Sequence, residues 1–179
     1  MLNYILVPGA MAVLGFAHRS SEVGDCEDKD TTVKGICVLN SEPGETARGV
    51  VHFEQANEHA KTHIHGEFVN LTKNHLHGFH IHAFGNLTKG CVTAGPHYNP
   101  HGKEHGGPFS SVRHVGDLGN VYANDKGEAT FDHQDSQISL IGQRSVIGRA
   151  CVLHKFTDDH GYGGNAESKK TGNAGPRIA

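Results

Sequence analysis

The chain has 179 residues, enough for one domain with its own core and an additional N-terminal extension. Its formal net charge of −3 gives no sign of the basic surface that binds nucleic acid or anionic membranes, so we expect no nucleic-acid partner and no stable membrane insertion. The 24 glycines predict many turns. The 16 histidines equal the lysines and arginines combined, and only their spacing can indicate whether they bind metal.

Residues 1–17 carry no charge and are mostly apolar, but they are too short and too broken by Pro8 and Gly9 for a membrane span. We interpret them as a secretory signal peptide, although its usual positive start is missing; the alternative is a buried or frayed segment. Two Asn-x-Thr glycosylation candidates, Asn70 and Asn86, fit export. The prediction is therefore a secreted protein, with a cytoplasmic location as the alternative.

A polar connector covers residues 18–30, and residues 31–179 form the predicted domain. Within the domain, seven short runs of apolar character are bounded by turn-forming residues. The runs are 31–39, 49–54, 63–69, 77–83, 120–123, 129–133 and 146–153. Because no long stretch has a helical period, they predict an all-β antiparallel sandwich or barrel.

Two segments, 84–113 and 155–177, are glycine-rich and polar, with neither a strand nor a helix period. Loops of this length in a compact domain are usually functional or disordered. The first is rich in histidine and the second begins directly after His154. We expect both to be functional loops.

The sequence contains two His-x-His pairs in predicted strands, His63 with His65 and His80 with His82. Side chains alternate across a strand, so both members of each pair point to one side. We interpret the first pair as solvent-facing, because no other candidate ligand lies near it in sequence. The second pair is followed by further candidate ligands, which are His97, His105, His114, Asp117 and His154.

The donor types favour two different metals. Three histidines and one aspartate suit a closed tetrahedral zinc site, whereas four imidazoles suit copper. Seven candidate ligands for two four-ligand sites require one residue to serve both.

Five motifs of this chain resemble those of the copper/zinc superoxide dismutases, in the family's order. They are Leu76–His82 (LHGFHIH), Ala94–Pro100 (AGPHYNP), His105–Pro108 (HGGP), Arg113–Asn120 (RHVGDLGN) and Gly172–Gly175 (GNAG). The resemblance extends from about Val33 to Ala179. It implies an immunoglobulin-like Greek-key antiparallel sandwich of eight strands, of which seven are visible here.

The resemblance also implies the ligand sets of one copper and one zinc ion per subunit. The copper ligands would be His80, His82, His97 and His154, and the zinc ligands His97, His105, His114 and Asp117. His97 would bridge the metals after its ring loses both nitrogen protons. Asp158 would join a copper histidine to a zinc histidine from outside the ligand set.

The implied reaction is dismutation of superoxide to oxygen and hydrogen peroxide by copper redox cycling, with His97 and Arg177 as catalytic residues. Arg177 would attract and dock the superoxide anion, and Thr171 would narrow the opposite wall of the channel. Lys170 and Glu167 would shape the local field, although both could equally be ordinary solvated surface charges. A homodimer that receives copper from a chaperone or in the secretory pathway is also implied.

The chain departs from the family near its end. Cys91 matches a family cysteine whose disulfide partner lies beyond Arg177-Ile178-Ala179, so that partner and the eighth strand are absent from this chain. We therefore expect the sequence to be partial. Cys26 could replace the partner in principle, but nothing around it supports this. Cys37 and Cys151 are interpreted as packing residues.

The alternative function is a non-catalytic relative, either a copper-chaperone domain or a metal buffer. Chaperones of this kind tend to lose copper ligands and carry an MxCxxC module, which this sequence lacks. The complete ligand set and Arg177 therefore favour the enzyme.

Overall fold

The structure is a computed structural model that describes residues 31–179; the predicted signal peptide, the connector and Cys26 lie outside this range. Its strands are β1 (Val33–Leu39), β2 (Arg48–Gln55), β3 (Thr62–Val69), β4 (His75–Ile81), β5 (Thr88–Cys91), β6 (Asp117–Ala123), β7 (Ala129–Asp135) and β8 (Cys151–Leu153). A 3-10 helix, η1 (Val92–Ala94), and a short α-helix, α1 (Ser168–Thr171), complete the elements.

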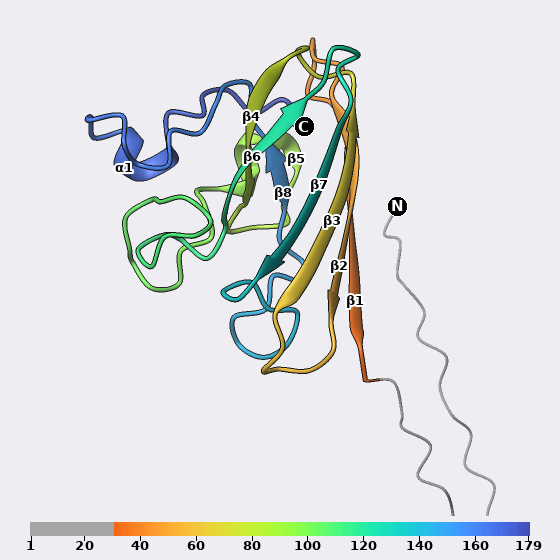
Figure 1. The fold of residues 1–179 in the computed structure, drawn as a ribbon, viewed down its shortest axis with the longest axis vertical. Helices are drawn as coiled ribbons and strands as arrows, with labels where there is room; N and C mark the ends of the chain where they lie inside the picture. Colours follow the sequence, from red (N-terminus) through yellow and green to blue (C-terminus); the bar gives the residue numbers. More distant parts are fainter. Residues whose placement is uncertain (1–30) are drawn as a thin grey trace, which may run out of the picture.

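Seven of these strands form two antiparallel sheets (Figure 1). One sheet has the order β1-β2-β3-β7 and the other β6-β4-β8, so the chain crosses between the sheets after β3, after β6 and after β7. The predicted all-β antiparallel sandwich is confirmed. The long loops and α1 project from the side of β4 that faces away from the four-stranded sheet (Figure 1).

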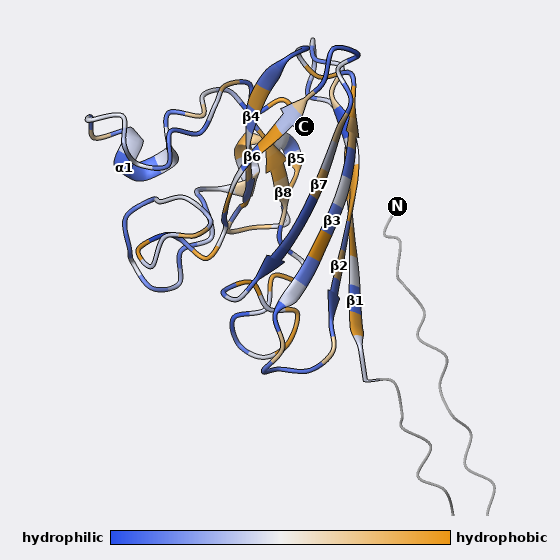
Figure 2. Cartoon of the chain, in the orientation of Figure 1, coloured by the Kyte–Doolittle hydropathy of each residue, from blue (hydrophilic) through white to orange (hydrophobic). Residues whose placement is uncertain are grey.

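The core lies between the two sheets because alternate residues of each strand point inward. On β3, Ile64 and Phe68 are buried, while the residues between them are partly or fully exposed or are glycine. Phe68 and Phe131 each meet Phe79 of the opposite sheet edge to face, at centroid distances of 5.4 and 5.6 Å. Burying one such side chain contributes about 1.5–3 kcal/mol. Figure 2 shows β8 as hydrophobic along its length, in agreement with its complete burial.

One predicted strand and two predicted loops differ most from the structure. The predicted strand 146–153 contributes only Cys151–Leu153, because Val146 and Arg149 donate backbone hydrogen bonds within local turns, to Ser139 and Val146, instead of to a ladder. The predicted loop 84–113 contains β5 and η1, and the predicted loop 155–177 contains α1. Elements this short produce no measurable period in a sequence.

The predicted packing cysteines lie together between β1 and β8. Cys151 belongs to the buried core and Cys37 packs against it, half-buried. A hydrogen bond with Cys151 lowers the pKa of Cys37, while burial raises the pKa of Cys151. No helix within residues 31–179 is long and apolar enough to cross a membrane.

Candidate metal centre

Four segments of the chain bring the seven expected ligands to one place beside β4. His80 lies on β4 and His82 directly after it, while the loop that follows supplies His97 and His105. His114 and Asp117 lie at the start of β6, and His154 follows β8. The seven side chains form two groups of four that share His97, and within each group the possible ligand atoms lie within 4.8 Å of one another. All seven residues are buried.

In the first group, one ring nitrogen of His82 and one of His154 donate hydrogen bonds to main-chain oxygens. His82 Nδ1 donates to the main-chain oxygen of Gly95 at 2.8 Å, and His154 Nδ1 donates to that of Gly175 at 3.0 Å. A carbonyl oxygen can only accept, so both neutral rings carry their lone pair on Nε2. These two Nε2 atoms lie 3.3 Å apart, an unfavourable approach of lone pairs that a cation between them would relieve.

His80 completes the same pattern. Its Nε2 donates to Asp158 Oδ2 at 2.9 Å, and its buried Nδ1 has no hydrogen-bond partner. The group therefore offers imidazole nitrogens as its donors, a set that suits copper.

In the second group, three imidazoles converge on the carboxylate of Asp117. His97 Nδ1 lies 2.8 Å and His114 Nδ1 3.1 Å from Oδ1. His105 Nδ1 lies 3.0 Å from Oδ2. Three imidazoles and one carboxylate match a tetrahedral zinc site.

The ring of His97 faces both groups. Its Nδ1 points at Asp117, whereas its Nε2 is buried without a partner. On that other side its centroid lies 4.0 Å from the ring of His80 and 5.0 Å from that of His82. A single imidazole is therefore placed to serve two ions.

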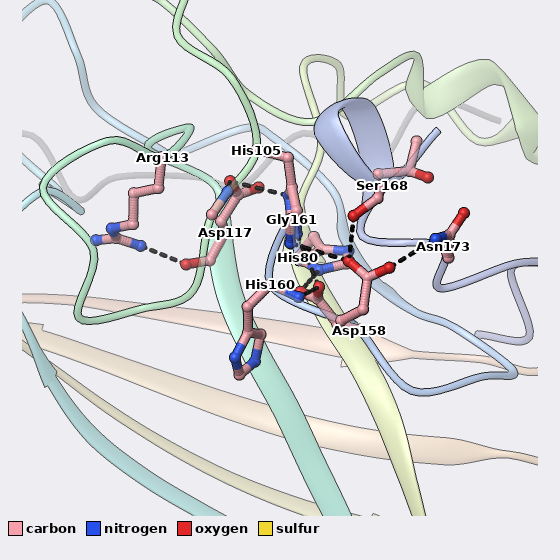
Figure 3. Close-up of polar contacts among 12 residues, drawn as sticks. His80, His105, Arg113, Asp117, Asp158, His160, Gly161, Ser168 and Asn173 are labelled. Atoms are coloured by element: carbon pink, nitrogen blue, oxygen red, sulfur yellow. Dashed lines mark hydrogen bonds and ion pairs between the residues drawn. The ribbon is translucent and has the colours of Figure 1, made fainter. Parts of the chain in front are cut away.

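Asp158 connects the groups from behind (Figure 3). Its Oδ2 accepts from His80, and its Oδ1 accepts from His105 Nε2 at 2.8 Å. Asn120 fixes the Asp158 backbone on both sides, accepting from its N–H at 2.7 Å and donating to its carbonyl oxygen at 2.8 Å. Partners of this kind fix ring orientation and tautomer.

The pKa values favour the forms that bind metals. Burial lowers the pKa of His154 to about 4 and holds those of His80, His82 and His97 below the usual range, so these rings are neutral. Burial alone would raise the pKa of Asp117, but hydrogen bonds from its three histidines hold it well below the usual range. It is therefore ionised.

His105 behaves differently from the other rings. Burial opposes its protonation, but bonds to Asp117 and Asp158 outweigh burial and raise its pKa to about 9. A metal ion would take the place of the extra proton of His105, since a ligand releases its proton when it binds a metal.

Two further residues that sequence analysis did not single out position this centre. The buried Arg113 forms an ion pair with Asp135, at 2.5 Å between Nη2 and Oδ2, and its Nη1 donates to the main-chain oxygen of Asp117. It therefore joins the end of β7 to the start of β6, where Asp117 lies. The Arg-His-Val-Gly-Asp segment belongs to one of the family motifs, but nothing in the sequence indicates that its arginine is buried.

An open cavity of about 1240 Å³ borders both groups, since His114 of the second group also lines it. His82, His97 and His154 line it together with the other expected site residues, Glu167, Lys170, Thr171 and Arg177. Arg177 is held by two carbonyl oxygens, that of Cys91 and, at 2.7 Å, that of Gly95, which also accepts from His82. Thr171 Oγ1 donates to Glu167 Oε1 at 2.8 Å.

Cys91 is a free thiol among the described residues. Burial and the neighbouring carboxylate of Glu42 raise its pKa to about 12, so it is protonated at neutral pH. Its backbone N–H donates to Glu42 Oε1 at 2.6 Å. The glycosylation candidates Asn70 and Asn86 are both exposed.

Comparison with known proteins agrees with this geometry. The family model for copper/zinc superoxide dismutase (SODC) matches residues 47–179. A Cu-Zn superoxide dismutase of Cordyceps militaris is 52% identical over 147 residues, which cover 82% of this chain and 94% of that protein. Cu-Zn superoxide dismutase 1 of Debaryomyces hansenii is 52% identical over 146 residues, with the same coverage. The Humicola lutea protein is 52% identical over 147 residues, 82% of this chain and 95% of its own.

We predict that Gly172→Ala displaces Asp158. Gly172 has a φ of +67°, and a Cβ there would lie 1.9 Å from Asp158 Oδ1 and 2.5 Å from His105 Nε2. Loss of such an outer partner should weaken metal binding about 10–100-fold, measurable as copper and zinc retained against a competing chelator.

The control for this substitution is Gly164→Ala. Gly164 has a similar φ of +74°, but nothing lies within 4 Å of its Cβ position. Both variants bear the same cost of a left-handed alanine, about 1–2 kcal/mol. Equal metal retention in the two variants would contradict the positioning role of Asp158.

Proposed function

The chain belongs to the copper/zinc superoxide dismutase family, and on this basis we propose the role of each site residue in the reaction. The reaction is the dismutation of superoxide to oxygen and hydrogen peroxide, with one copper and one zinc ion per subunit. Bound copper supplies the one-electron redox chemistry, and zinc supplies a fixed positive charge.

We propose that copper is held by His80 through Nδ1 and by His82, His97 and His154 through Nε2. The support is that the opposite nitrogen of each ring is already engaged, by Asp158, Gly95, Asp117 and Gly175 respectively. The proposed zinc ligands are Nδ1 of His97, His105 and His114, with the carboxylate of Asp117.

The observation that carries the proposal is the two-sided placement of His97. We infer that this ring is the bridge and also a proton carrier. Its Nε2 has no hydrogen-bond partner, and the residue lines the cavity through which substrate enters. A proton on His97 Nε2 can therefore be donated to superoxide as it is reduced in the cavity, while His97 Nδ1 stays beside Asp117.

Arg177 is the proposed docking residue for the superoxide anion. The cavity is lined by five cationic side chains, Lys103, Arg149, Lys169, Lys170 and Arg177, but by only two carboxylates, Glu104 and Glu167. Local positive charge in a cleft raises the association rate of an anion even when the whole protein is negative. Lys170 and Glu167 are exposed at its rim, and Thr171 narrows it.

We also propose that the protein is secreted, with a cytoplasmic location as the alternative. Both sequons are accessible, since Asn70 and Asn86 are exposed.

The backbone around Phe84 is hydrogen-bonded to Ala94 and Ala150, near the exposed apolar residues Val92 and Ile147. This apolar surface supports a homodimer. Copper would come from a chaperone in the cytoplasm or be loaded during secretion.

Native mass spectrometry of protein purified from the culture medium of its source tests these last proposals together. We expect a mass reduced by removal of about the first 17 residues, increased by glycans at one or both sequons, and doubled by dimerisation. A single-subunit mass would refute the dimer, and a full-length, unglycosylated chain found only inside cells would refute secretion.

The function itself is tested by comparing His97→Ala with His63→Ala. Because His97 serves both groups, its loss should deplete both metals and reduce superoxide consumption to near background. His63 lies outside both groups, so its variant should retain activity and the copper and zinc of these groups. Equal losses in both variants would overturn the assignment, and two bound metals without turnover in the unmodified protein would favour the metal buffer.

Arg177→Gln should reduce kcat/KM by about tenfold or more and flatten its dependence on ionic strength, because steering by charge is screened by salt. Metal content should stay normal. Arg144→Gln removes the same charge outside the cavity and is the matched control. If both variants slowed turnover equally, the effect would come from net charge and not from docking.

A further inference from the structure

The outer face of the four-stranded sheet carries the histidine pair that the centre does not use. On β3, Thr62, Ile64 and Phe68 are buried, whereas His63 and His65 point outward with side chains 38% and 40% exposed. This face lies away from the loops and α1 that surround the centre of His97 (Figure 1). Any ligand bound here would leave the substrate cavity open.

A carboxylate lies between these two rings. His63 Nε2 is 3.2 Å from Asp132 Oδ1, and His65 Nδ1 is 3.2 Å from Asp132 Oδ2. Asp132 belongs to β7, where it is the direct cross-strand neighbour of His65. This contact could not be predicted from the sequence, because the sheet joins residues that are 67 and 69 positions apart.

The surrounding side chains add donors and negative charge. His52 of β2 is the cross-strand neighbour of His65 on the other side, so its imidazole belongs to the same row. Glu67 Oε1 lies 4.0 Å from His65 Nε2. Lys34, the neighbouring cation, forms an ion pair with Glu54 at 3.0 Å. Hydrogen bonds from His65 and His63 also lower the pKa of Asp132, so this carboxylate is ionised.

Two imidazoles and a carboxylate form a donor set that binds divalent transition ions, and His-x-His on one strand presents both rings to one side. A metal ion would replace the imidazole protons that now contact Asp132. The three side chains are not among the groups whose ligand atoms lie within 4.8 Å of one another, so binding requires the partly exposed rings to turn toward a common ion, with water at its remaining positions. Such a site should be weaker and more exchangeable than the buried centre.

We propose that His63, His65 and Asp132 form a peripheral site for a divalent transition-metal ion such as Zn²⁺, with His52 as an additional donor. The site is separate from the metal centre in both residues and location. Neither His63 nor His65 contributes to the two ligand groups around His97.

The test uses protein whose buried copper and zinc positions are filled and from which loose metal has been removed. Zn²⁺ is then titrated by calorimetry at neutral pH. We expect one further equivalent to bind to the unmodified protein, and His65→Ala and Asp132→Asn, on two different strands, each to weaken it at least about tenfold. His59→Ala, which removes an 87% exposed imidazole outside the cluster, is the matched control and should leave the titration unchanged.

The absence of a further equivalent would overturn the proposal, as would an unchanged titration in both His65→Ala and Asp132→Asn. Superoxide consumption measured on the same samples shows that each variant is folded, because neither residue belongs to the metal centre. A protein that binds the extra ion but does not consume superoxide would refute the proposed function and leave this inference intact. Histidine ring NMR signals that move on Zn²⁺ addition should be those of His63 and His65, not His59.

Discussion

The carboxylate of Asp158 accepts hydrogen bonds from His80 and His105, two rings that belong to different ligand groups, and the rest of the centre is arranged around this shared acceptor. A buried carboxylate is costly unless its oxygens are fully bonded. Here His160 also donates its backbone N–H to Oδ1 at 2.7 Å, and Asn120 holds the Asp158 backbone. The loop after β8 is therefore tied to β4 and to the first long loop through the Asp158 side chain, and to β6 through the Asp158 backbone.

The same constraint explains why the long loops are ordered with so little regular structure. Asp159 accepts from Ser168 Oγ at 2.7 Å and from Asn173 Nδ2 at 2.6 Å, which fixes α1 and the turn behind it. Gly172 then passes so close to Asp158 that no Cβ fits. These contacts hold the segment that carries Thr171, whereas the carbonyl oxygens of Cys91 and Gly95 hold Arg177 on the cavity wall. Substrate access and metal geometry thus depend on neighbouring polar contacts.

The parts that sequence analysis predicted well are those with a repeating pattern. The alternation on β2 and β3 predicted both strands to within one residue at each end, and the two chemistry-rich loops followed from their lack of any period. The ligand set came from the family resemblance, and the structure gathers its side chains into two groups. The polar residues that position the centre were missed, because membership of a motif does not reveal the contacts of Arg113 and Asn120, Asp135 belongs to no motif, and only the fold brings Arg113 and Asp135 within 2.5 Å. The strand predicted from Val146 failed because turns satisfy its first backbone groups.

The two His-x-His pairs differ in surroundings and not in spacing. The rings of His80 and His82 are buried, so burial keeps them neutral, and their free nitrogens face other nitrogens that cannot donate to them. The rings of His63 and His65 are partly exposed and both contact the carboxylate of Asp132. Buried imidazoles with unpartnered ring nitrogens give up little by binding an ion, whereas imidazoles at a surface exchange one polar partner for another. Burial therefore decides which pair forms a permanent centre, and the other is restricted to exchangeable binding.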